Sequence, residues 1–104
     1  MSTSSGRFRL VVQKGPNPGK TFDLTQIVAI IGRDASADIA VSDVEVSRQH
    51  ARLSATENGF TIEDLASTNH TFLDGEKLVP NTPVPLPKSA RVRFGPDTEA
   101  VSYT

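Results

Sequence analysis

The sequence of 104 residues contains no cysteine, no excess of basic residues, and no long apolar segment. The absence of cysteine excludes a disulfide framework, thiol catalysis and cysteine metal sites, and it fits a reducing compartment. A membrane-spanning helix needs about 20 consecutive apolar residues, which this chain lacks. The net charge of −1 gives no basic surface of the kind that attracts nucleic acid. We therefore expect a cytoplasmic protein that binds neither nucleic acid nor membrane.

Length and composition indicate one folded domain. A chain of 104 residues with 37% hydrophobic residues can enclose a single core. Residues 1–6 are polar and rich in serine, and they lack the apolar segment of a secretory signal peptide. We therefore predict a disordered tail over residues 1–6 and one domain over residues 7–104, without an internal repeat.

The pattern of apolar residues predicts a series of short strands and no helix. Segments that alternate in polarity, or that are rich in β-branched residues, are separated by turn-forming residues. The predicted strands cover residues 7–13, 21–24, 27–32, 39–41, 51–55, 59–65, 71–73, 76–78, 84–86, 90–94 and 100–103. The β-branched segment 27–32 is predicted to be buried, and Asn58-Gly59 and Asp74-Gly75 are predicted to form hairpins, because both residue types accept positive φ. This organisation is typical of an all-β sandwich or barrel.

Three short polar clusters lie next to apolar segments, where loops are expected. They are Gly32-Arg33, the Ser-Arg-Gln-His sequence of residues 47–50, and the segment of residues 64–71. Together they supply two guanidinium groups, several hydroxyls and a carboxamide, which are donors suited to a small tetrahedral anion. Loops on a rigid scaffold are where binding residues concentrate. The clusters therefore indicate binding rather than catalysis.

The three clusters resemble those of a known family. Gly-Arg, then Ser-Arg-x-His, then Asp-Leu-x-Ser-x-Asn-x-Thr-Phe, in this order and at this spacing, is similar to the forkhead-associated (FHA) domain. That resemblance implies a sandwich of about eleven short, mostly antiparallel strands with binding loops at one end. It also implies a monomeric module of Ser/Thr kinase signalling that binds a phosphothreonine-containing protein or peptide, has no cofactor or metal, and is not an enzyme.

The resemblance assigns binding roles to five residues. Arg33, Ser47, Arg48 and Thr68 would surround the phosphate, and Asn69 would bond the main chain of an extended peptide through its amide donor and carbonyl acceptor. From position alone, alternatives stay open. Arg33 could cap loop carbonyl groups, and Arg48 could pair with a neighbouring acidic residue at position 43 or 45.

A second set of residues is expected to shape the loops rather than contact the ligand. These scaffold residues are Gly32, His50, Asp64, Ser67 and Thr71. His50 also permits a catalytic interpretation, because Ser47 and Asp64 supply the other residue types of a triad. A Ser-x-x-His spacing on one loop provides no nucleophile elbow or oxyanion hole, so we favour the structural role.

Two points remain open in the sequence. Residues 69–71 read Asn-His-Thr where the family usually has Asn-Gly-Thr, so His70 would have to adopt a left-handed backbone conformation that favours glycine. The alternative function is a phosphate-independent protein-interaction domain built on the same sandwich.

Overall fold

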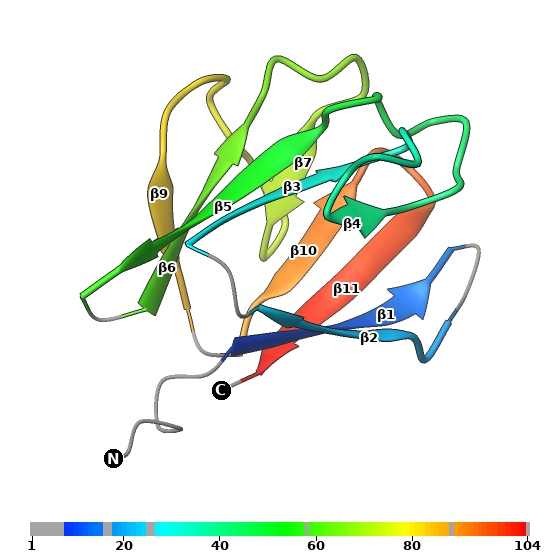
Figure 1. Ribbon diagram of the computed structural model, residues 1–104. Helices are drawn as coiled ribbons and strands as arrows, with labels where there is room; N and C mark the ends of the chain where they lie inside the picture. Colours follow the sequence, from blue (N-terminus) through cyan, green and yellow to red (C-terminus); the bar gives the residue numbers. More distant parts are fainter. Residues whose placement is uncertain (1–7, 16–17, 25–26, 58, 88, 104) are drawn as a thin grey trace.

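Eleven strands make up the described part of the chain. The computed structural model describes residues 8–15, 18–24, 27–57, 59–87 and 89–103 (Figure 1). The strands are β1 (Phe8–Lys14), β2 (Thr21–Leu24), β3 (Val28–Gly32), β4 (Ile39–Ala40), β5 (Ala51–Thr56), β6 (Gly59–Asp64), β7 (Thr71–Leu73), β8 (Glu76–Lys77), β9 (Val84–Leu86), β10 (Arg91–Phe94) and β11 (Thr98–Tyr103). Within these ranges there is no helix, and so none that could span a membrane. The predicted tail over residues 1–6 lies outside the described residues.

The strands form two sheets. One sheet has the order β2-β1-β11-β10-β7-β8 and the other the order β4-β3-β5-β6-β9 (Figure 1). Only β3 and β4 pair in parallel among the described pairs, and all other pairs are antiparallel. The predicted sandwich of about eleven mostly antiparallel strands is therefore confirmed.

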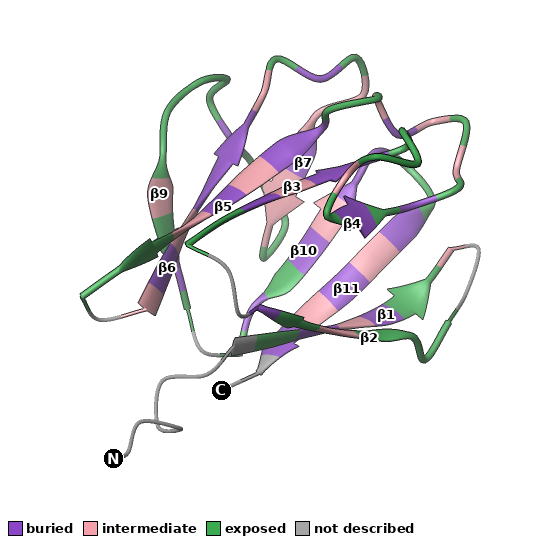
Figure 2. Cartoon of the chain, viewed as in Figure 1, coloured by how far each residue is buried: buried purple, intermediate pink, exposed green. Residues whose placement is uncertain are grey.

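The core lies between the sheets because successive side chains of a strand point to opposite faces. In β5, Ala51 and Leu53 are buried while Arg52 and Ser54 face outward, which gives the striped pattern of Figure 2. The core residues are Leu10, Leu24, Ala29, Ile31, Ile39, Val41, Val46, Ala51, Leu53, Phe60, Ile62, Leu78, Leu86, Ala90, Val92, Phe94 and Ala100.

The prediction that segment 27–32 is a buried strand was wrong for its first residues. Ile27 is 76% exposed and Val28 is 44% exposed, whereas Ala29 and Ile31 are buried. No further layer covers the outer face of this sheet in the described part of the chain, so β3 is buried on one face only. β-branched residues suit a half-buried strand as well as a buried one.

The predicted hairpins are present. Asp74 and Gly75 have φ values of 50° and 89°, and Leu73 pairs with Glu76 across them. Both positions of a type I′ turn need positive φ, which explains the Asp-Gly pair. Thr56 pairs with Gly59 at the other predicted hairpin, whose Asn58 lies outside the described residues.

Candidate functional site

Gly32 lets two of the polar clusters meet through their backbones. Where β3 ends, the Arg33 N–H donates to the Ser47 carbonyl at 2.9 Å. A Cβ atom on Gly32 would lie 1.9 Å from the Arg48 carbonyl oxygen, far inside van der Waals contact. The approach of the loop after β4 to the end of β3 therefore requires glycine at this position.

His50 joins the second cluster to the third. Its ring is buried, its Nδ1 atom accepts the Ser47 N–H at 3.1 Å, and its Nε2 atom lies 2.8 Å from the His70 carbonyl oxygen. An acceptor at Nδ1 requires the neutral ring with its proton on Nε2, which donates to His70. Burial is the main cause that lowers the pKa of His50, which favours the same neutral form.

The catalytic alternative for His50 lacks the geometry it needs. Both ring nitrogens of His50 are committed to backbone groups, so neither is available as a general base. The Ser47 hydroxyl instead accepts the Thr68 N–H at 3.0 Å. Triad chemistry requires a hydrogen bond between the nucleophile and its base, and the Ser47 hydroxyl and the His50 ring do not form one.

A buried carboxylate shapes the loop between β6 and β7. Asp64 accepts the Ser67 hydroxyl at 2.5 Å, the Ser67 N–H at 3.2 Å and the Thr71 hydroxyl at 2.7 Å. The loop ends at His70, whose φ of 70° is the left-handed conformation expected where the family usually has glycine. Its carbonyl also accepts the Gly95 N–H at 3.0 Å, which ties this loop to the turn after β10.

All five residues predicted to bind the ligand line one surface hollow of about 480 Å³. The lining residues are Arg33, Val44, Glu45, Val46, Ser47, Arg48, Thr68 and Asn69. The structure thus brings together side chains from three loops that are up to 36 positions apart (69 − 33) in the sequence.

The two guanidinium groups that line the hollow differ in their contacts with the rest of the protein. Arg33 donates from Nε to the Val46 carbonyl at 3.0 Å, so the loop-capping alternative holds for this one nitrogen. Its terminal nitrogens have no hydrogen-bond partner among the described residues. Arg48 is exposed, and the ion pairs of the described part of the chain do not include it. Asp43 does not form the ion pair considered for Arg48, because its two carboxylate oxygens instead accept the Glu45 N–H and the Thr98 hydroxyl.

Asn69 has a partner that sequence reasoning did not assign. Its Nδ2 donates to the Glu45 carbonyl and to Glu45 Oε1, both at 2.9 Å. The amide hydrogens are therefore used inside the protein, and the carbonyl Oδ1 is the group left for a peptide N–H. Residues 24 positions apart give no local pattern by which this contact could have been found.

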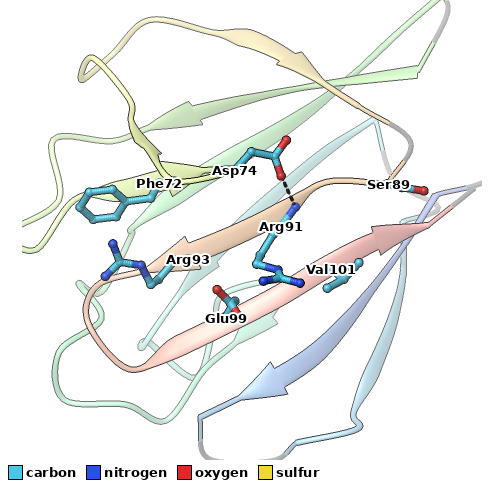
Figure 3. Close-up of a pocket in the computed structure, with 8 residues that line it drawn as sticks. Phe72, Asp74, Ser89, Arg91, Arg93, Glu99 and Val101 are labelled. Atoms are coloured by element: carbon cyan, nitrogen blue, oxygen red, sulfur yellow. Dashed lines mark hydrogen bonds between the residues drawn. The ribbon is translucent and has the colours of Figure 1, made fainter.

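A second hollow, of about 520 Å³, lies on the outer face of the six-stranded sheet. Figure 3 shows Phe72, Arg91, Arg93 and Glu99 around it. Arg93 stacks over Phe72, with its guanidinium carbon 4.0 Å from the ring centre. None of the predicted binding residues line this hollow, and its two arginines are balanced by two lining carboxylates, those of Glu99 and Asp74.

Comparisons with known proteins agree with this architecture. The FHA domain model matches residues 29–95, which confirms the resemblance. The chain is 41% identical over 73 residues to the glycogen accumulation regulator GarA of Mycobacterium tuberculosis, covering 70% of this chain and 45% of GarA. It is 40% identical over 72 residues to the oxoglutarate dehydrogenase inhibitor of Corynebacterium glutamicum, covering 69% of this chain and 50% of that protein. The chain thus spans about half the length of these curated relatives.

A solved structure extends the similarity over the whole sandwich. The FHA domain of a hypothetical protein from Arabidopsis thaliana has a TM-score of 0.87 and 31% sequence identity with this chain. The match covers 99% of this chain and 92% of the Arabidopsis chain.

Proposed function

Because this chain belongs to the FHA domain family, we propose that it binds a phosphothreonine in an extended segment of a partner protein. The observation that carries the proposal is the hollow at the loop end of the sandwich, where Arg33, Ser47, Arg48, Thr68 and Asn69 converge. Hydroxyls and guanidinium groups that form no ion pair among the described residues are suited to a phosphate dianion.

In the proposed complex, each residue has one role. Arg33 and Arg48 donate charge-assisted hydrogen bonds to the phosphate, and the hydroxyls of Ser47 and Thr68 donate to its remaining oxygens. Asn69 accepts a peptide N–H through Oδ1. Gly32, His50 and the Asp64 cluster with Ser67 and Thr71 hold the loops in place.

The proposal extends to the setting in which the module works. We propose a monomeric, cytoplasmic binding module that recognises the substrate of a Ser/Thr kinase and has no catalytic activity of its own. The names of the two relatives, a regulator and an inhibitor, support a role in controlling other proteins. The commitment of both His50 nitrogens to backbone groups also supports a non-enzymatic role.

Fluorescence anisotropy with a phosphothreonine peptide library tests the proposal. We expect phosphothreonine peptides to bind with a Kd of about 1 μM, which corresponds to about −8 kcal/mol. The unphosphorylated versions should not bind, and phosphoserine versions provide the comparison for the threonine methyl group. Arg33→Ala and Ser47→Ala should each weaken binding at least about tenfold, since a hydrogen bond to a charged group contributes about 1.5–3 kcal/mol.

Arg91→Ala is the matched control, because Arg91 is also an exposed arginine without an ion pair in the described part of the chain but lies on the other hollow. It should bind as tightly as the unmodified protein. Equal affinity for phosphorylated and unphosphorylated peptides would instead favour the phosphate-independent interaction domain. No binding by a folded protein would reject both functions for this hollow.

A further inference from the structure

We propose that the segment bound by this protein carries a lysine or arginine close to the phosphothreonine, and that Glu45 and Val44 select it. This inference rests on the proposed function, because the same hollow would hold the phosphate. Both residues line the hollow, yet neither has a role in phosphate binding.

The Glu45 carboxylate is fixed at one oxygen and open at the other. Oε1 accepts from Asn69 Nδ2 at 2.9 Å, which orients the side chain. Oε2 has no hydrogen bond or ion pair within the described residues. No buried side-chain oxygen or nitrogen of those residues lacks a partner, so Oε2 is accessible rather than buried. A half-buried carboxylate therefore presents one free oxygen at the hollow.

The charge of the hollow changes sign once the phosphate is bound. Its lining carries two positive side chains, Arg33 and Arg48, and one negative side chain, Glu45. A phosphothreonine brings about −1.5 to −2 charges, which offset the two guanidinium groups. Glu45 is then left uncompensated beside a dianion, and the nearby Asp34 carboxylate, which interacts electrostatically with Arg48 and Arg33, adds to the negative charge. A cation supplied by the ligand removes that repulsion, whereas an acidic ligand residue increases it.

Val44 favours a cation on a long apolar stem. It is 82% exposed, the highest value among the exposed large hydrophobic residues of the described chain, and it precedes Glu45 in the lining of the hollow. Lysine and arginine cover apolar surface with their methylene groups while the charged head stays at a polar group. The stem would pack on Val44 and the head would pair with Glu45.

The position of the cation follows from Asn69. Glu45 Oε1 is 2.9 Å from Nδ2 of Asn69, the residue proposed to bind the peptide main chain. An extended peptide advances about 3.3 Å per residue, and a lysine or arginine side chain spans about two such steps. Asn69 follows Thr68, a proposed phosphate ligand, so the peptide residue that it binds should be next to the phosphothreonine, and two further steps place the cation within about three residues of it.

A peptide series separates the charge from the stem. Alanine, norleucine or lysine is placed in turn at each of the three positions before and after the phosphothreonine of an otherwise neutral peptide. At one position lysine should bind about three- to fivefold more tightly than norleucine, and norleucine more tightly than alanine. The lysine preference should shrink as salt is raised, because the pair is partly exposed.

Matched variants assign each preference to a residue. Glu45→Gln keeps an acceptor for Asn69 and removes the charge, so the lysine-to-norleucine ratio should fall to about one. Val44→Thr keeps the side-chain shape and should reduce the norleucine-to-alanine ratio. Glu57→Gln is the control, since Glu57 follows β5 at the end opposite the hollow, about 20 Å away at about 3.3 Å per residue.

The outcomes distinguish this inference from the function on which it rests. Absence of phosphate-dependent binding would overturn both. Phosphate-dependent binding in which lysine is never better than norleucine, or in which Glu45→Gln leaves the ratio unchanged, would overturn the inference alone. A preference that Glu57→Gln reduces as much as Glu45→Gln would assign it to net charge rather than to Glu45, and would also overturn it.

Discussion

The packing of the binding loops depends on Gly32, because no residue with a side chain fits at this position. Gly32→Ala would place a methyl group 1.9 Å from the Arg48 carbonyl oxygen, and backbone cannot move aside as a flexible side chain can. We expect the variant to lose at least about 3 kcal/mol of unfolding free energy, at the upper end of overpacking effects. Urea denaturation followed by circular dichroism measures this loss.

Gly75→Ala is the comparison for that experiment. Gly75 has a φ of 89°, but beyond its two chain neighbours no atom lies within 4 Å of a Cβ at its position. It should lose only about 1 kcal/mol, the cost of a positive φ for a residue with a side chain. If Gly32→Ala were no less stable than Gly75→Ala, the close approach of the loops would not be needed for the fold.

Single residues also mark the limit of what the sequence could predict. The types and order of the clusters predicted Arg33, Ser47, Arg48, Thr68 and Asn69, and the structure brings these five together around one hollow. The sequence indicated Glu45 as a possible partner of Arg48 and as a charge that would disfavour acidic residues in the ligand, but not as a partner of Asn69. Its contact with Asn69 depends on how two distant loops pack, and no periodicity or turn preference records such a contact.

At the scale of elements, the loops are linked through the His50 ring. Because burial lowers the pKa of His50, the unfolded chain binds a proton more readily than the folded protein below about pH 6.5. The contribution of the neutral, buried His50 ring to the unfolding free energy is fully present above that pH, and it is lost as the pH falls toward the lowered pKa of the folded protein. The unfolding free energy should therefore fall between pH 7 and pH 5.5, by up to about 1.4 kcal/mol per pH unit.

Two measurements check this pH dependence. Long-range ¹H–¹⁵N NMR spectra of the histidine rings should show His50 with its proton on Nε2 and with a pKa below 6.5. His70→Asn removes the only other histidine and should retain the loss of stability at low pH. A His50 ring that titrates at or above 6.5 would contradict the prediction.

The positions of the strands were easier to predict from the sequence than the burial of their side chains. Strands such as 21–24, 71–73 and 84–86 were predicted with the bounds that the structure has, because short alternating segments between turn residues leave little choice of period. The start of β11 was predicted two residues late, since Thr98 and Glu99 are polar. They belong to the strand through their pairing with Phe94 and Arg93. Pairing of this kind depends on the neighbouring strand rather than on the segment itself.

At the scale of the whole molecule, the first and last strands pair with each other inside the six-stranded sheet. β1 pairs with β11 along most of its length, and β11 pairs with β10. The segment of residues 29–95, which carries the family pattern, includes neither β1, β2 nor β11. That segment would retain only β10-β7-β8 of the sheet and would lose the core residues Leu10, Leu24 and Ala100.

We therefore expect residues 29–95 to be unfolded alone, although they contain every residue proposed to touch the ligand. The three remaining strands of the six-stranded sheet are too few to cover the apolar face of the five-stranded sheet or to keep Val92 and Phe94 of β10 buried. Sheets this small are marginally stable in water. Residues 8–103 contain all eleven strands and should unfold cooperatively in urea. Amide dispersion in NMR spectra compares the two fragments. A cooperative transition in residues 29–95 would contradict this expectation. It would show that the five-stranded sheet and its binding loops are stable without β1, β2 and β11.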